Sequence, residues 1–575
     1  MKISDAYPTR VRRYQWFTIL AVITVSLALT SAPPWGAFAQ EPQQAQQQAA
    51  AQQQATTTIP EIKLVPVSLE GPVERAEKDG TALRASLRDI IKMALQANLD
   101  IAIAETAEDN LQARIQAAKA AYDPNFSSSF SWSDTKSLNF NAYDAAKTSI
   151  NATLNHSWSA TVSQAVPIGG NFSFRLNGSR ADTNSSATLA NPRYNAGWSL
   201  TYTQQLLRDF KIDSNRNGIK VANLNLRNND TTFKQSVSNI VRDVENAYWG
   251  LVQQIESYKI AVASVKQARL TVDTNIKKRD IGVIAPIDVI SSQSSQARQE
   301  VSLLSAEDSV QRAENSLRTL ISKDRSADIW SKTIIPTDVP DVTEFKIDLN
   351  TAIATAIKNS PSIESIDNQL EQADLSNQLT LNSRKWSLSL QGSINSTSSG
   401  VPEGNKQFPQ KLWGGLGTSY LYMFNTQPPS WSFSLSLSLP LSHRANDAAL
   451  AQNVISKQNL LMNRSKTEQS VVVQVRNAVQ GLTTAKKQID TADIGAQAAQ
   501  AQLDATQKRV DAGLATNTEL IISQDNLNQA KNSLLTAKIG YRTAILNLQQ
   551  AMFTLLDANN INTGEITKDK KLTFK

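Results

Sequence analysis

Two stretches of this 575-residue chain, KKRDIGVIAPIDVISSQ at 277–293 and KRVDAGLATNTELIISQ at 508–524, carry the same motif at an offset of 231 residues. Gly282 falls on Gly513, and both stretches end in Ser-Gln. A glycine can adopt the left-handed conformation that ends a helix. The residues after each glycine suit a helix start, with Pro286 in the first copy and a Thr-x-x-Glu capping box in the second. Each stretch therefore predicts a helix, a tight turn and a second helix.

The flanking sequence repeats as well, which indicates an internal duplication. At the same offset, IVRDVENAYWGL at 240–251 matches VVVQVRNAVQGL at 471–482. A different offset of 262 residues aligns Leu87, Ala94 and Ile101 with Leu349, Ala356 and Ile363. The two halves thus share one order of elements, and the first half carries about thirty more residues in its middle.

Long helices are predicted on both sides of each glycine turn. Proline is absent between Pro192 and Pro286 and after Pro440. Within 472–512, small or apolar residues recur at a mean spacing of about 3.5 residues, which is typical of helices packed as a coiled coil. A helix over about 217–278 would be roughly 90 Å long at ~1.5 Å per residue, longer than a compact domain is wide.

Other segments alternate apolar and small polar residues, as strands do. The clearest are SWSFSLSLSLPL at 430–441 and KWSLSLQGSI at 385–394, and the first half adds four runs at 125–132, 156–162, 171–176 and 198–203. A half-buried strand of a soluble sandwich has this pattern, and so does a membrane barrel with a wet lumen. One chain supplies too few strands for a channel-wide barrel, so several chains would have to share one.

Composition and the N-terminal region narrow the function. Basic residues, an apolar run and Ala37-Phe38-Ala39 predict a secretory signal over 1–39, with an uncleaved anchor as the alternative. The chain has no cysteine, which excludes disulfides and cysteine-held metals, and its formal charge of +7 comes without a basic patch interleaved with aromatics. Nucleic acid is therefore not an expected partner. The sequence shows no catalytic or metal-ligand constellation, so neither enzyme activity nor a cofactor is expected.

The duplicated layout, the glycine turns and the strand-ending segments TQQLLRDF (203–210) and SLPLSHR (438–444) together resemble TolC-type outer-membrane factors over about 86–557. The resemblance implies a mixed α and β membrane protein. It would be a homotrimer with a shared twelve-stranded outer-membrane barrel, continued by an α-helical coiled-coil barrel in the periplasm. It also implies a periplasmic adaptor and an inner-membrane transporter of RND or ABC type as partners, with outer-membrane lipid around the barrel. The missing N-terminal cysteine places the chain with the non-lipidated members.

Four strand-like runs in the first half depart from the two that the family usually has, and they would form either one folded-over hairpin or extra barrel strands. The predicted organisation of the chain is a signal over 1–39, a flexible Gln/Ala-rich lead-in over 40–85, a first repeat over 86–325, a connector over 326–345, a second repeat over 346–556 and a tail over 557–575.

Asp288 and Glu519 each come six residues after their turn glycine. In the resembled family, acidic residues just after these turns line or tie an entrance that closes like an iris. The resemblance therefore makes both residues candidates for a periplasmic gate, whereas their position alone is also explained by helix capping. Gly282 and Gly513, with the apolar Val283 and Leu514 after them, are candidates for docking the adaptor.

The predicted function is a passive exit duct for drugs and other small molecules in a tripartite export system, opened by its partners. A duct for type I protein secretion is an alternative within the same class. An alternative of another class is a non-conducting coiled-coil spacer or adhesin of the cell envelope.

Overall fold

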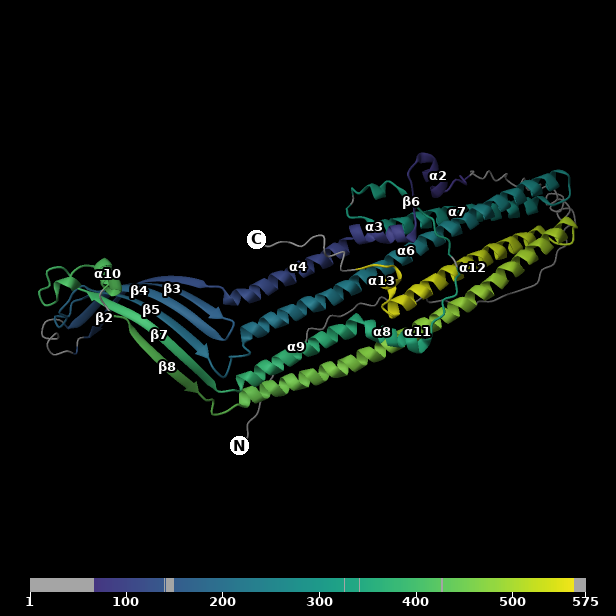
Figure 1. The fold of residues 1–575 in the computed structure, drawn as a ribbon. Coiled ribbons are helices and arrows are strands. Elements are labelled where there is room, and N and C mark those ends of the chain that lie inside the picture. The colour runs from purple at the N-terminus through teal and green to yellow at the C-terminus, as the bar shows by residue number, and fades with distance from the viewer. Residues whose placement is uncertain are drawn as a thin grey trace, which may run out of the picture. The chain divides into compact units, whose positions relative to one another are not determined.

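Two helices of nearly equal length run through the computed structural model of the protein, α6 (Ser214–Asp280, 67 residues) and α11 (Arg444–Asp511, 68 residues). They confirm the long helices predicted from the sequence (Figure 1). The structure describes residues 67–562, apart from 139, 141–148, 325, 341, 426 and 427. These described residues lie in one compact unit, Leu64–Lys575. The predicted signal over 1–39, the first part of the lead-in and the end of the tail lie outside them.

Burial explains why α11 stays helical over so many turns. The eleven small or apolar residues that recur between Val475 and Val510 are all buried or half-buried, while the residues between them are largely exposed. This stripe packs against α12 (Asn517–Ala551) and forms a helical hairpin with it. In the same way α6 pairs with α7 (Pro286–Ile321). The 3.5-residue spacing therefore marks the true contact face.

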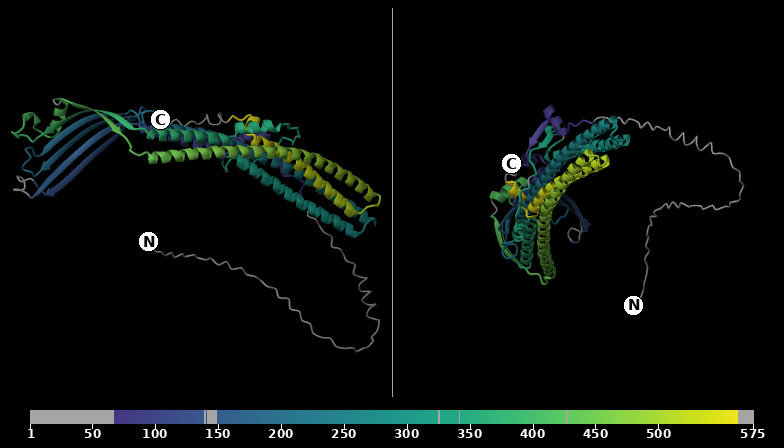
Figure 2. Two further views of the ribbon diagram at one scale, coloured as in Figure 1. Left: turned by 90° about the horizontal axis from the view of Figure 1, so that it is seen from below. Right: turned by 90° about the vertical axis from the view of Figure 1, so that its right-hand side faces the viewer.

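The remaining helices flank these two hairpins. Near the strands, α6 packs against α4 and α9, and α11 packs against α9; nearer the turns, α12 contacts both α6 and α11 (Figure 2). The other helices that the structure describes are α2 (Pro72–Asp79), α3 (Leu87–Ala97), α4 (Leu99–Lys119), α8 (Leu349–Asn359), α9 (Pro361–Ser383), α10 (Leu416–Asn425) and α13 (Leu555–Ala558), with single 3-10 turns at Ala120–Tyr122, Asp328–Trp330 and Gln410–Leu412.

The duplication predicted from the sequence is visible in the core. Val244 and Val475, matched at the 231-residue offset, are both fully buried. Ala94 and Ala356, matched at the 262-residue offset, are 2% and 0% exposed. Equivalent positions of the two repeats therefore support equivalent helix contacts.

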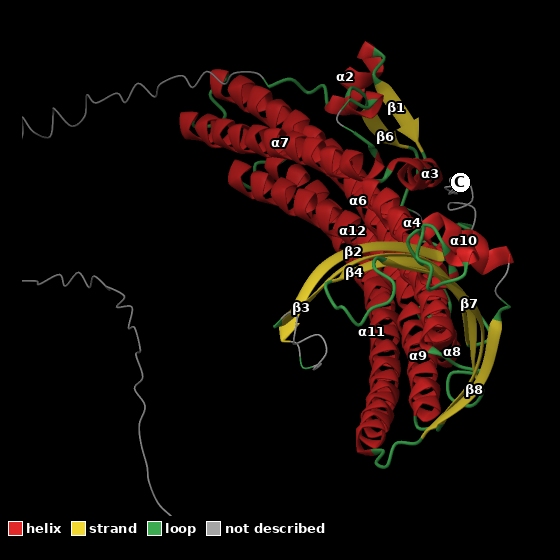
Figure 3. Ribbon diagram, turned by 90° about the vertical axis from the view of Figure 1, so that its left-hand side faces the viewer, coloured by secondary structure: helices red, strands yellow, loops and turns green. Residues whose placement is uncertain are grey.

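Six strands form one antiparallel sheet with the order β2-β3-β4-β5-β7-β8. Seen from the strand end, they trace an arc (Figure 3). Their bounds are β2 Asn125–Leu138, β3 Ile150–Val166, β4 Gly170–Thr183, β5 Arg193–Gln205, β7 Ser387–Gly400 and β8 Ser430–Ser438. The four runs in the first half are thus four separate strands. The implied barrel of twelve strands from three chains, four from each, does not match the six strands that the described residues contribute to this sheet. The extra strand pair also accounts for the greater length of the first repeat.

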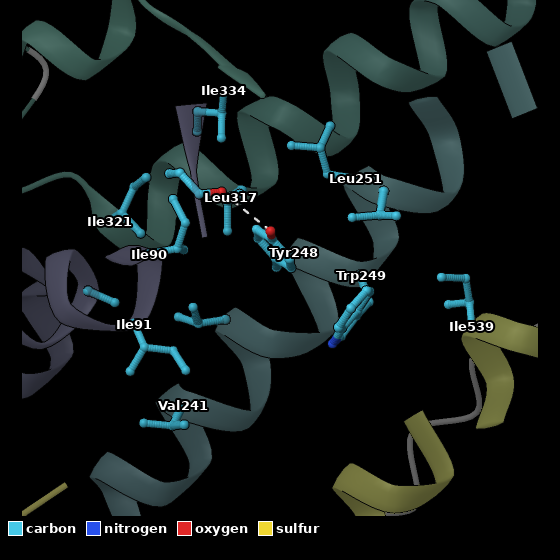
Figure 4. Close-up of a cluster of buried hydrophobic side chains, with 14 of the residues drawn as sticks. Ile90, Ile91, Val241, Tyr248, Trp249, Leu251, Leu317, Ile321, Ile334 and Ile539 are labelled. Atoms are coloured by element: carbon cyan, nitrogen blue, oxygen red, sulfur yellow. Dashed lines mark hydrogen bonds between the residues drawn. The ribbon is translucent and has the colours of Figure 1, made fainter. Parts of the chain in front are cut away.

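A small two-stranded parallel sheet lies beside the helices, where β1 (Ala82–Ala85) pairs with β6 (Thr333–Pro336). It belongs to a buried apolar cluster that includes Ile90, Tyr248 and Ile334 (Figure 4). The Tyr248 hydroxyl donates to Asp338 Oδ2 at 2.7 Å, and burial raises the pKa of this phenol. The cluster joins segments from both ends of the first repeat.

The lead-in predicted over 40–85 is too long at its C-terminal side. Within it, α2 begins at Pro72 after the N-cap residue Gly71, and β1 pairs with β6. Ala76 and Ala85 are buried. The Gln/Ala-rich composition ends well before residue 72, so extending the lead-in to 85 was wrong. The predicted connector over 326–345 likewise contains β6.

Candidate functional site: the hairpin turns and the face between the hairpins

The two hairpin turns share the same backbone conformation and the same backbone hydrogen bonds. Gly282 and Gly513 have φ values of 76° and 74°. The N–H of Val283 donates to the carbonyl of Lys278 at 2.8 Å, and the N–H of Leu514 donates to Arg509 at 2.7 Å. This six-to-one bond together with a left-handed glycine is a Schellman motif. A Cβ at either glycine would meet no atom within 4 Å, so the backbone conformation, rather than space, requires glycine.

The apolar residues next to the glycines point away from the helices. Val283 is 65% exposed and Leu514 is 72% exposed, and Ile281 beside them is exposed as well. Both hairpins therefore end in a small apolar surface at their turns. An apolar side chain at such a tip contributes no core packing, which is why these positions remain candidates for contact with another protein.

The two acidic candidates have different surroundings. Glu519 completes the capping box of α12, because its N–H donates to Thr516 Oγ1 at 3.2 Å and its carboxylate accepts from the N–H of Thr516 at 3.5 Å. The carboxylate also lies 3.5 Å from the guanidinium of Arg509. Asp288 lies in the first turn of α7, where its negative charge suits the helix N-terminus. Its carboxylate has no hydrogen bond or ion pair among the described residues. Capping thus accounts for Glu519 more fully than for Asp288.

Polar contacts join the two hairpins just behind the turns. Asn517 donates to the carbonyl oxygen of Asp288 at 3.3 Å, so the start of α12 lies against the start of α7. Further from the turns, Gln299 Nε2 of α7 donates to Asp525 Oδ1 of α12 at 2.9 Å. A third bond of 3.4 Å runs from Gln524 to Thr271 of α6. Hydrogen bonds, rather than a dry apolar seam, connect the hairpins here.

Asp525 borders a polar pocket of about 390 Å³ lined by α6, α7, α11 and α12. Burial raises the pKa of Asp525, and Arg298 and the bond from Gln299 counteract that shift. Asp504 and Lys531 are the other charged residues of the lining. The carboxylate of Asp525 thus lies half-buried at a contact between the hairpins, where burial disfavours its charged form.

At the end of the molecule opposite the hairpin turns, the strands give the sheet two chemically different faces. One registered row crosses all six strands with only apolar residues, namely Phe126, Val162, Phe174, Leu200, Ile394 and Trp431. The neighbouring row on the opposite face is Ser127, Thr161, Arg175, Ser199, Asn395 and Ser430. The edge strands leave the large apolar residues Phe130 and Phe433 more than 70% exposed. Such a sheet suits lipid on one side and water on the other.

Part of the apolar face is covered by α10. The ring of Tyr420 on α10 lies 5.7 Å from that of Trp158, and Ser396 Oγ donates to the carbonyl of Met423 at 3.2 Å. Small residues make room for this helix, because a Cβ at Gly178 would lie 2.2 Å from the Tyr420 hydroxyl. On its other side α10 exposes Leu421 and Phe424.

Within residues 67–562, and leaving aside the few positions not described, no group of histidine, aspartate and glutamate side chains is arranged to hold a metal ion. In the same part of the chain, no helix is both long enough and apolar enough to span a membrane.

Comparison with known proteins identifies the family. The family described as outer membrane efflux protein matches residues 168–323 and 352–552, together more than half of the sequence and one match in each repeat. The chain belongs to the outer membrane efflux protein family. This family consists of passive, non-enzymatic channels that in general form trimers and work with an adaptor and an inner-membrane pump. A comparison with curated proteins gave no match.

Solved structures share the fold. The Campylobacter jejuni CmeC outer membrane channel aligns with a TM-score of 0.58 at 15% identity, covering 88% of this chain and 98% of CmeC. The outer membrane protein VceC of Vibrio cholerae gives 0.56 at 16% identity, with coverages of 81% and 95%. The open state of the Neisseria gonorrhoeae MtrE outer membrane channel gives 0.54 at 15% identity, with coverages of 81% and 88%. At these identities the similarity concerns the fold alone.

These findings confirm the family and the two-repeat α and β architecture predicted from the sequence, and they favour a channel over a spacer. Asp288, Glu519, Gly282, Val283, Gly513 and Leu514 all lie at or next to the hairpin turns, while their roles in gating and docking stay predictions. Sequence reasoning missed Gln299 and Asp525. They are 226 residues apart, and only the folded hairpins bring them together.

Proposed function

We propose that this protein is the outer-membrane exit duct of a tripartite export system for drugs and other small molecules. The observation that carries the proposal is the sheet with one apolar and one polar face, which continues directly into the long helices. An apolar outer wall and a serine-lined inner wall fit a water-filled passage through lipid. The helices would extend this passage into the periplasm as part of a homotrimer.

In this proposal, the hairpin turns form the periplasmic end. The exposed tips at Val283 and Leu514 would dock a periplasmic adaptor, which connects the duct to an inner-membrane transporter of RND or ABC type. The carboxylates of Asp288 and Glu519 would lie near the mouth. Three copies would bring six carboxylates together there and favour cations over anions.

Opening would require the two hairpins of each copy to separate near their turns. The contacts that hold them there are few and polar, and the bond between Gln299 and Asp525 is the shortest of them. Polar contacts exchange readily with water, so an adaptor at the tips needs to overcome only a modest free energy. Protonation of Asp525 favours the packed arrangement, because burial penalises its charged form.

Cells from which the gene is deleted test the assignment. We expect them to accumulate a fluorescent dye such as ethidium and to become sensitive to unrelated drugs, with recovery on re-expression of the full chain. A variant with Val283→Asp and Leu514→Asp, expressed at the same level, should fail to restore efflux because charges replace the apolar tips. Unchanged dye accumulation in the deletion, together with loss of a secreted protein, would contradict the efflux role and support protein secretion.

A further inference from the structure

The six-stranded sheet ends in two long strands whose outer edges have no partner among the described residues. β2 and β8 each pair on one side only, and every residue of both strands is exposed. Neither strand contains a proline. Natural proteins shield such edges, because a row of free N–H and C=O groups is a template for another strand. In lipid these groups have no water to bind, so both edges need partners.

The directions of the strands make a second copy of the chain a suitable partner. All five pairings from β2 to β8 are antiparallel, so with six strands β8 runs opposite to β2. If β2 of another copy lies beside β8, the antiparallel pattern continues without interruption. Each copy offers one edge of each kind, and such head-to-tail contacts close into a ring when the rotation permits.

The register shows that the sheet is staggered as a closed barrel requires. The row that starts at Asn125, the first residue of β2, runs through Ser163, Ser173, Thr201 and Ser393 to Ser432. Both Asn125 and Ser438 border the helical part, yet the row reaches β8 six residues before Ser438. Six residues over five strand steps, at ~3.3 Å per residue and ~4.8 Å between strands, correspond to a tilt of about 40°. Barrel strands tilt by about 35–45°.

We propose that β2 of one copy pairs with β8 of the next, and that three copies close an eighteen-stranded barrel in the outer membrane. This inference rests on the proposed trimeric duct and specifies the width of its membrane part. With the same strand spacing and tilt, an eighteen-stranded barrel has a backbone diameter of about 36 Å, against about 24 Å for twelve strands. The additional strand pair in the first repeat thus widens the exit.

The face pattern is compatible with this closure. The apolar residues Trp431, Phe433 and Leu435 of β8 continue onto Phe126 and Phe130 of the next β2 when both strands turn the same face outward. The serines between them then meet on the inner wall. Extrapolating the stagger across the contact places Ser434 next to Ser129 or Ser131 of the neighbouring copy.

The absence of cysteine from the chain allows a direct test by disulfide cross-linking. Ser434→Cys is combined with Ser129→Cys or with Ser131→Cys in the full chain, which is purified from outer membranes and oxidised. Cross-strand neighbours have Cβ atoms about 4.5–5.5 Å apart, close enough for a disulfide after small shifts. We expect covalent species of two and three copies on non-reducing gels, with none larger than three copies.

Two further variants make the result decisive. Ser393→Cys with Ser432→Cys is the positive control, since these hydroxyls lie 2.7 Å apart within one chain and should give an intrachain disulfide. Ser434→Cys with Arg175→Cys tests a twelve-stranded closure, in which β4 rather than β2 would be the edge. Cross-linking through Arg175→Cys instead of β2 would overturn the eighteen-stranded barrel and leave the duct intact. If Ser434→Cys cross-linked with neither Ser129→Cys nor Ser131→Cys while the control disulfide formed, that result would also overturn the eighteen-stranded barrel. Absence of channel activity from the chain without cysteine substitutions would count against the proposed function instead.

Discussion

Two substitutions of Asp525 should change the contact between the hairpins in opposite directions. Its carboxylate accepts a hydrogen bond of 2.9 Å from Gln299, and burial raises its pKa. When Asp525 is protonated, Asp525→Ala removes an uncharged hydrogen bond, which costs about 0.5–1.5 kcal/mol, or roughly two- to twelvefold in the equilibrium between packed and separated hairpins of each copy. Asp525→Asn keeps an acceptor for Gln299 and removes the charge that burial disfavours. We therefore expect Ala to loosen the contact and Asn to tighten it.

The raised pKa of Asp525 determines the direction of the pH effect. Because the packed state holds the proton more tightly than separated hairpins do, the protonated carboxyl stabilises packing. That stabilisation is present at low pH and is lost as the pH rises from the ordinary carboxyl range through the raised pKa of Asp525. Acidification should accordingly lower the open fraction of the wild-type channel. Neither variant has the carboxyl group of Asp525, so this change of the open fraction with pH should be missing from both.

Single-channel recording in planar bilayers over a range of pH measures the open fraction directly. Ala should raise it at all pH values, while Asn should hold it near the acidic wild-type level. If Asn opened the channel as much as Ala does, the attraction between the carboxylate and Arg298, rather than the neutral hydrogen bond, would hold the hairpins together. That result would refute the reasoning.

Three more variants test other parts of the structure. The double variant Asp288→Asn/Glu519→Gln should reduce cation preference, seen as a smaller reversal potential in a salt gradient; an unchanged potential would leave both residues as helix-end groups. Gly513→Ala should lower the thermal unfolding midpoint, because a left-handed alanine costs about 1–2 kcal/mol. Its matched control is Gly250→Ala, in the interior of α6, which should not lower that midpoint. Tyr248→Phe should cost about 1.5–3 kcal/mol, because the buried tyrosine hydroxyl donates to a carboxylate, and a chemical denaturation curve unchanged from wild type would contradict that role.

Sequence periodicity predicted the helical half of this fold well. The 3.5-residue seam of 472–512 identified the buried face of α11, and the glycine motif located both turns with their left-handed φ values. These features depend on residues that are close in sequence. Local patterns of this kind determine helix phase and helix ends without knowledge of distant contacts.

The strand half was predicted less completely. Alternation located all six strands of the sheet. The four runs in the first half were shorter than the strands that contain them, whereas the run at 430–441 extends past the end of β8 and the run at 385–394 begins before β7. Alternation could not distinguish four separate strands from a folded-over hairpin in the first repeat. That choice depends on pairing between strands such as β5 and β7, which are far apart in the chain. The parallel pairing of β1 with β6 was missed for the same reason, since four-residue strands carry little pattern.

In the candidate site, too, features set by local sequence could be predicted, whereas contacts between distant segments could not. The turn residues Gly282 and Gly513 could be found because the duplication repeats them. The contact between Gln299 and Asp525 could not, because neither residue belongs to a local motif and their partnership arises only when two hairpins pack. For the two acidic candidates, the sequence predicted the capping box of Thr516 and Glu519, and the structure adds the ion pair of Glu519 with Arg509; the carboxylate of Asp288 has no such partner among the described residues.

The most direct test of the channel assignment is the conductance of the purified, detergent-solubilised full chain in a planar lipid bilayer. The account predicts discrete single-channel steps with a preference for cations, from a protein that requires detergent to remain dispersed. Well-folded protein that stays monodisperse without detergent and produces no current steps would contradict the central claim.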